Sequence, residues 1–130
     1  MDLTIIMNNL EYVIAIILVI YIVSYFFQGN KEDLVIDESI PRFVNYNASW
    51  CYYSRELEET WSRLTEAYKD LPIQIINFKC DTQEHEEKCK LNEIYSYPTL
   101  RLYNGSEMIE YSGDRTFQDL SKFINDNVNS

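Results

Sequence analysis

The hydrophobic positions of this chain follow two different patterns. From Leu10 to Phe27 nearly every residue is apolar, whereas from residue 42 onward apolar and polar residues alternate at short intervals. The first segment has 18 residues and is apolar on all faces. At about 1.5 Å per residue it spans roughly 27 Å, close to the thickness of a bilayer's hydrocarbon core. We therefore predict a single N-terminal transmembrane helix within residues 1–28.

The flanks of this segment favour an uncleaved signal anchor over a signal peptide that is removed. No Lys or Arg precedes Lys31, and no small-residue cleavage step follows the apolar run. Tyr25, Phe26 and Phe27 at its end resemble the aromatic belt of a membrane interface. A membrane is therefore an expected partner.

The rest of the chain predicts one α/β domain. Residues 29–41 are expected to form a linker and a shortened domain start, and the domain itself to cover residues 42–130. The spacing of apolar residues predicts strands over 42–47, 73–78, 99–103 and 107–111, and helices over 54–71, 82–92 and 116–127. This order predicts a parallel βαβ unit, then an antiparallel hairpin at Asn104-Gly105 and a covering helix. The result is a mixed sheet of about four strands flanked by helices.

Composition and charge narrow the chemistry. The net charge is −10, and about −8 of it lies after the apolar segment, which opposes binding to phosphate backbones and excludes nucleic acid as a partner. The single His85 lies in an acidic run and is expected to be an exposed helix residue, so no Cys/His set suits a metal. We predict no metal and no cofactor.

Cys51 is the candidate reactive group. It lies in Trp50-Cys51-Tyr52-Tyr53-Ser54, where a predicted strand gives way to a long helix. Backbone N–H groups and the helix dipole at such a position favour a thiolate over a thiol. Arg55 should add to this effect.

These residues resemble a known family. Trp50-Cys51-x-x-Ser54, Tyr97-Pro98-Thr99-Leu100, the Asn104-Gly105 turn and the stretch from Tyr111 to Arg115 are similar to the catalytic domains of protein disulfide isomerases. The resemblance implies a thioredoxin-like fold and a cis Tyr97–Pro98 bond whose backbone meets an extended client.

It also implies that aromatic residues around the sulfur contact the client protein. The residues so implied, with the proline, are Trp50, Tyr52, Tyr53, Tyr97 and Pro98.

Two departures from the family pattern change the expected activity. Ser54 stands where oxidoreductases carry a second cysteine, and Asn45 stands where they carry a buried carboxylate. A hydroxyl cannot resolve a mixed disulfide, and an amide cannot act as a base. The site most resembles the endoplasmic-reticulum thiol-retention chaperone whose motif is Cys-Arg-Phe-Ser.

The expected activity is therefore monothiol. Cys51 would form mixed disulfides with client thiols or disulfides, for isomerisation or for holding a client, with Ser54 stabilising the thiolate. Release would need a client thiol, glutathione or another oxidoreductase, and net dithiol oxidation is not expected. The alternative is a non-catalytic thioredoxin-like adaptor or structural membrane protein; a third hypothesis, monothiol glutaredoxin chemistry, is weaker.

The remaining features bear on the compartment. The family resemblance suggests Cys80 and Cys89 as a structural disulfide, with two buried free thiols as the alternative. Sequons begin at Asn47 and Asn104, of which Asn104 is the expected glycan acceptor because Asn47 lies close to Cys51. Lys31 and Arg42 weakly favour a cytoplasmic domain. On balance we expect a lumenal or extracytoplasmic domain, in the endoplasmic reticulum or, for a viral protein, in a virion or host membrane.

Overall fold

The computed structural model describes residues 3–27 and 36–129 of the 130-residue chain. It divides into two compact units, residues 1–35 and residues 36–130. Residues 28–35 lie outside the described residues, and they include the first part of the linker predicted over residues 29–41.

The first unit contains one helix, α1, which covers Leu3–Phe27. It begins seven residues before the predicted apolar run, because Leu3, Ile5, Ile6 and Met7 extend the helical sequence toward the N-terminus. None of its residues is buried within the structure. With 25 residues, the helix is long enough and apolar enough to cross a membrane.

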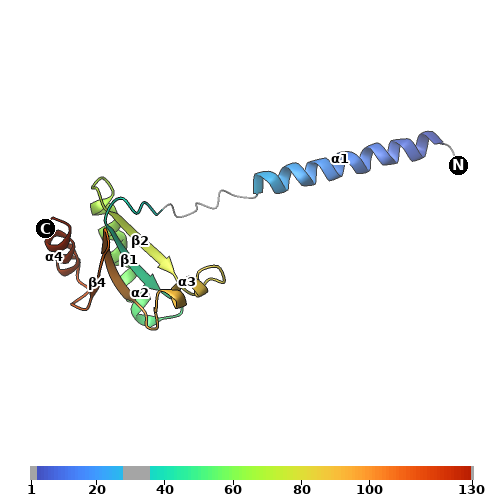
Figure 1. The fold of residues 1–130 in the computed structure, drawn as a ribbon. Coiled ribbons are helices and arrows are strands. Elements are labelled where there is room, and N and C mark those ends of the chain that lie inside the picture. The colour runs from blue at the N-terminus through green and yellow to red at the C-terminus, as the bar shows by residue number, and fades with distance from the viewer. Residues whose placement is uncertain (1–2, 28–35, 130) are drawn as a thin grey trace. The chain divides into compact units, whose positions relative to one another are not determined.

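The second unit is built on a four-stranded mixed sheet, which confirms the predicted fold class (Figure 1). The strands are β1 (Arg42–Asn47), β2 (Gln74–Lys79), β3 (Thr99–Asn104) and β4 (Glu107–Tyr111), in the spatial order β2-β1-β3-β4. β1 is parallel to β2 and antiparallel to β3, and β3 is antiparallel to β4. The tight turn between β3 and β4 has Gly105 at a φ of 59°, a conformation that glycine adopts without steric cost.

Three helices complete this unit: α2 (Tyr52–Tyr68), α3 (Glu86–Leu91) and α4 (Phe117–Val128). α3 is shorter than the helix predicted over residues 82–92. Residues 82–85 form a bend and a turn, and α3 begins only at Glu86, where the N–H groups of His85 and Glu86 both donate to the Thr82 carbonyl. The charged pattern of this segment was compatible with either form.

The two faces of the sheet carry separate cores. On one face, Phe43, Leu100 and Leu102 pack against α2 and α4, which contribute Trp61, Leu64, Leu120 and Ile124 among others. On the other face, Val44, Tyr46, Ile76 and Phe78 pack against Cys80, Cys89 and Ile94. The alternation of β1 side chains between these cores fixes its register, and with it the position of the residues that follow β1.

Residues 36–41 contain turns but no helix or strand, and they are held by two bonds to Gln74: its N–H donates to the Pro41 carbonyl at 2.9 Å, and its side-chain oxygen accepts from Asp37 N–H at 2.9 Å. Within residues 36–129, β2 is an edge strand of the sheet.

Candidate functional site

Cys51 is the residue that links β1 to α2. It occupies the N-cap position of α2 in an extended conformation, and its N–H donates to the Ala48 carbonyl at 3.0 Å. The side chain therefore lies at the open end of the helix, where backbone N–H groups have no helical acceptors. Cys51 is partly exposed and is the free cysteine of the chain.

The surroundings lower the pKa of the Cys51 thiol from its ordinary value. The largest cause is the Ser54 backbone N–H, which bonds the sulfur. The Tyr53 N–H, the Ser54 hydroxyl and the charge of Arg55 act in the same direction, while desolvation opposes them. A helix N-terminus thus stabilises the thiolate, which is the nucleophilic form.

Ser54 is fixed beneath the cysteine. Its side chain is buried, and its Oγ accepts a hydrogen bond from Ala48 N–H at 3.3 Å. That bond uses an oxygen lone pair and leaves the hydroxyl proton available to the Cys51 sulfur. The position predicted to replace a resolving cysteine is therefore a positioned donor.

The Tyr97–Pro98 peptide bond is cis, which confirms that expectation from the sequence. The Tyr97 carbonyl lies 3.4 Å from the Cys51 sulfur, whose thiol donates to it. Pro98 is buried, and Tyr97 is half-buried. The loop before β3, 46 residues away along the chain, thus forms one wall of the site.

Exposed aromatic rings stand on both sides of Cys51 in the sequence. Trp50 meets Tyr97 edge to face with 5.9 Å between ring centroids, and Tyr52 meets Tyr53 in the same manner at 5.5 Å. Trp50, Tyr52 and Tyr53 are each about two-thirds exposed, at 68%, 59% and 62%. These rings offer apolar area that no other part of the described domain covers.

Asn45 is buried in β1, where its side-chain nitrogen donates to Asn77 Oδ1 at 3.3 Å. Its own Oδ1 has no hydrogen-bond partner among the described residues. No carboxylate occupies this position, so the buried proton acceptor that the family pattern places there is replaced by a neutral amide.

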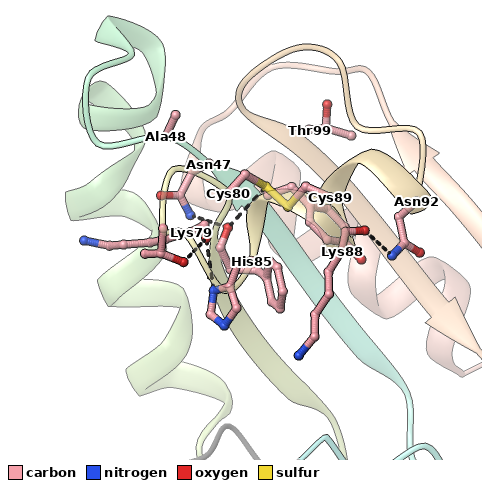
Figure 2. The surroundings of a disulfide bond; sticks show 12 residues. Asn47, Ala48, Lys79, Cys80, His85, Lys88, Cys89, Asn92 and Thr99 are labelled. Atoms are coloured by element: carbon pink, nitrogen blue, oxygen red, sulfur yellow. Dashed lines mark hydrogen bonds between the residues drawn. A yellow bond between two sulfur atoms is a disulfide. The ribbon is translucent and has the colours of Figure 1, made fainter.

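Cys80 and Cys89 are joined by a disulfide (Figure 2). Cys80 directly follows β2 and its N–H donates to the Asn47 carbonyl at 2.8 Å, while Cys89 lies on α3. Both are buried. The bridge closes the segment of residues 81–88 beside the end of β1.

His85 differs from its prediction. It is half-buried and precedes α3, its ring stacks on Phe78 with 4.3 Å between centroids, and its Nδ1 lies 3.0 Å from the Lys79 carbonyl (Figure 2). The disulfide folds this segment back onto the sheet, which a helical pattern does not indicate. Among the described residues no group of three His, Cys, Asp or Glu side chains could hold a metal ion.

The two sequon asparagines have different surroundings. Asn47 is buried, and its nitrogen donates to the Asn45 carbonyl, to Asn77 Oδ1 and to the Phe78 carbonyl. Asn104 is half-buried at the end of β3, and its nitrogen donates to the Asn127 carbonyl at 3.3 Å. Asn104 is thus the more accessible of the two.

Asp81 is a site residue that the sequence did not suggest. Its carboxylate accepts a hydrogen bond from Ser49 N–H at 2.9 Å, two residues before Cys51. That N–H is the main reason why the pKa of Asp81 lies below its usual range. The contact joins segments 32 residues apart, and no local pattern records it.

A family model described as Thioredoxin matches residues 23–126. The chain belongs to the thioredoxin family. Among curated proteins of this family, it is 33% identical over 98 residues to the protein disulfide-isomerase of Gallus gallus, and 32% identical over 100 residues to a thioredoxin domain-containing protein 5 homolog of Drosophila melanogaster. These alignments cover 73% and 74% of this chain but only 18% and 24% of the relatives.

Solved thioredoxin-family structures agree with the fold. The J-Trx1 fragment of ERdj5 superposes with a TM-score of 0.65 at 24% identity, over 72% of this chain and 46% of that one. Human ERp44 superposes with a TM-score of 0.63 at 24% identity, over 75% of this chain and 30% of that one. The chain therefore spans less than half of these relatives' lengths.

Proposed function

We propose that this protein forms mixed disulfides with client proteins through the single thiol of Cys51, for isomerisation or for holding a client. The observation that carries the proposal is the placement of the Cys51 sulfur at the N-terminus of α2, with a lowered pKa and within 3.4 Å of the Tyr97 carbonyl. The similarity to protein disulfide isomerases supports thiol–disulfide exchange as the reaction class.

The exchange needs no second cysteine in its first step. The Cys51 thiolate attacks one sulfur of a client disulfide, the client S–S bond breaks, and the other client sulfur leaves as a thiolate with the electron pair. The product is a Cys51–client disulfide and a free client thiol. Ser54 cannot attack this bond, so an external thiol from the client, glutathione or another oxidoreductase must release it.

The client would approach along the loop before β3. An extended client segment can pair with the backbone beside the cis Tyr97–Pro98 bond, as added strands do at sheet edges. Trp50, Tyr52 and Tyr53 then supply exposed aromatic area next to the client's sulfur. In the alternative hypothesis Cys51 is kept only for packing, which its exposure and lowered pKa do not favour.

We also propose that α1 anchors the domain to a membrane and that the domain faces an oxidising lumen. Support comes from the length and apolar character of α1, from the Cys80–Cys89 disulfide and from the accessible sequon at Asn104. If this is correct, expressed wild-type protein loses mass on glycosidase treatment, and Asn104→Gln abolishes the loss while Asn47→Gln does not. Wild-type protein whose mass does not change on glycosidase treatment would contradict glycosylation at Asn104.

The proposed function is tested with the full chain in a nonionic detergent. A peptide disulfide is added, and the mass of the protein is followed with time. We expect a one-to-one Cys51–peptide adduct that persists until a small thiol is added, and no adduct with Cys51→Ala. Absence of a Cys51-dependent adduct would contradict the proposal.

A further inference from the structure

A hollow of about 390 Å³ is lined in part by two neighbours of Cys51: Trp50, the preceding residue, and Tyr97, whose carbonyl accepts from the Cys51 thiol. Its lining residues are Ala48, Trp50, Cys80, Asp81, Glu86 and Tyr97. Two of these are aromatic and two carry carboxylates, and none carries a positive charge. This combination is unlike the second hollow near the site, where Tyr52 and Tyr53 share the lining with both Glu56 and Arg115.

The carboxylate that matters in this hollow is Asp81. Glu86 is paired with Lys90 at 2.7 Å, so its charge is largely compensated. Asp81 is anchored by a backbone donor, Ser49 N–H, and the same bond holds its pKa low, with Lys79 adding to the effect. Asp81 is therefore a charged group at neutral pH whose position is fixed relative to Cys51.

The position of Asp81 is fixed from the other side as well. The preceding residue, Cys80, is bridged to Cys89 and donates its N–H to the Asn47 carbonyl (Figure 2). The carboxylate therefore sits on a loop that is tied to β1 by a backbone bond and to α3 by a disulfide. Trp50 and Tyr97, which meet edge to face, line the same hollow.

A carboxylate and aromatic rings that line one hollow can together bind an organic cation. A lysine or arginine side chain gains from the ring faces and from the carboxylate at once, and its aliphatic stem covers apolar wall. Since two of the lining residues, Trp50 and Tyr97, are direct neighbours of Cys51, an occupant of the hollow would come from residues close to the client's cysteine.

We propose that Asp81, with Trp50 and Tyr97, selects clients that carry a lysine or arginine within two residues of the cysteine that reacts with Cys51. This inference rests on the proposed mixed-disulfide function and names the class of client for it. Asp81 acts here as a specificity-determining residue and takes no part in the transfer of electrons.

The test compares three peptides that differ only in one residue next to their cysteine: Lys, Gln or Glu. Each cysteine is activated as a mixed disulfide with 5-thio-2-nitrobenzoate. Attack by Cys51 on the peptide sulfur forms the Cys51–peptide bond and expels the coloured thiolate, whose absorbance reports the rate, while the protein mass verifies the adduct. Reaction of the same peptides with 2-mercaptoethanol, a neutral thiol, corrects for their intrinsic reactivity.

With the full chain in detergent, we expect the Lys peptide to react about fivefold faster than the Gln peptide, and the Glu peptide to react slowest. The preference should shrink at about 1 M salt, where the Debye length is only about 3 Å. Asp81→Asn keeps an acceptor for Ser49 N–H and should remove the preference, and Asp81→Lys should reverse it.

Asp70→Asn is the matched control, because Asp70 is exposed and lies beyond the far end of α2. It should keep the preference of the wild type. Equal corrected rates for the three peptides, or a preference that survives Asp81→Asn, would overturn this inference while leaving the proposed function intact. Failure of Cys51 to react even with the Gln peptide would overturn both.

Discussion

Ser54 and Asn45 are the residues at which a small change of side chain should most change the chemistry of the site. Ser54 lies three residues after Cys51, buried beneath it, and Asn45 is buried in the preceding strand. Ser54 lacks the sulfur that would resolve a mixed disulfide, and Asn45 lacks a carboxylate that could accept a proton during exchange.

Ser54→Cys should convert the site to a dithiol. A sulfur at this position can attack the mixed disulfide from within the helix turn, so client adducts should become short-lived and an internal disulfide should form. Thiol counting and the loss of two hydrogens by mass would report it. Ser106→Cys, on the β3–β4 turn, adds a thiol away from the site and should leave the adducts persistent, with no internal disulfide to Cys51. Persistent adducts with Ser54→Cys would contradict this prediction.

Adding Asn45→Asp to Ser54→Cys should accelerate resolution further. A carboxyl group buried at this position has its pKa raised by desolvation, which allows it to accept a proton near neutral pH. The measurement is the rate at which adduct disappears, as a function of pH. A double variant that resolves no faster than Ser54→Cys alone at any pH would show that the amide is not the limiting loss.

The pH dependence of Cys51 alkylation follows from its lowered pKa. Because only the thiolate reacts, the rate should level off at a lower pH than it does for a free thiol, and it should fall with decreasing pH only below that point. Arg55→Gln should move the profile to slightly higher pH, because the charge of Arg55 is lost while the Ser54 and Tyr53 N–H donors remain. Arg63→Gln, two turns further along α2, is the control; a profile equal to that of a free thiol would contradict the lowered pKa.

Among the site residues, those whose positions depend on neighbours along the chain were predictable from the sequence. The strand-to-helix junction and the Ser54 hydroxyl follow from local spacing, and the structure brings Cys51, Ser54 and Tyr97 together. Asp81 was not predictable, because its bond to Ser49 depends on how the disulfide-closed loop meets the end of β1.

Among the elements, the segment of residues 80–89 owes its form to a covalent bridge. Replacing Cys80 and Cys89 with Ala removes the crosslink from the unfolded chain, and we expect a loss of about 2–3 kcal/mol in the free energy of unfolding. Chemical denaturation of the variant and of the wild type would measure it. A loss below about 0.5 kcal/mol would contradict a structural role for the bridge.

Helix α2 is held to the sheet by its apolar face. Leu64 is fully buried in the core on this face, so Leu64→Ala should lower the free energy of unfolding by about 2–5 kcal/mol. Leu91, at the end of α3, is 77% exposed, and Leu91→Ala should cost little. Equal losses for the two variants would contradict the assignment of the core.

The elements themselves were largely predictable, because alternation in β1 and the 3.6-residue spacing in α2 and α4 are strong signals. The extent of α3 was not, since its charged sequence is compatible with a helix over the whole segment, whereas residues 82–85 form a turn before the helix begins at Glu86. The disulfide remained an open alternative in the sequence because nothing local decides whether two cysteines meet.

The whole molecule combines a hydrophobic helix with a strongly acidic domain. Residues 3–27 should hold the protein in the membrane fraction during alkaline carbonate extraction, because a predominantly apolar helix of 25 residues is more stable in the bilayer than in water. A variant lacking residues 1–28 should be released to the supernatant. Release of the wild type under the same conditions would contradict membrane anchoring.

Trapping from cells is a direct test of whether Cys51 holds clients as mixed disulfides. Cells expressing the wild type, Cys51→Ala or Ser54→Cys are treated with an alkylating agent and analysed without reduction. We expect high-mass adducts with the wild type that disappear on reduction, that are absent with Cys51→Ala and that are depleted with Ser54→Cys. Adducts of equal abundance with Cys51→Ala, or none with the wild type, would contradict this expectation.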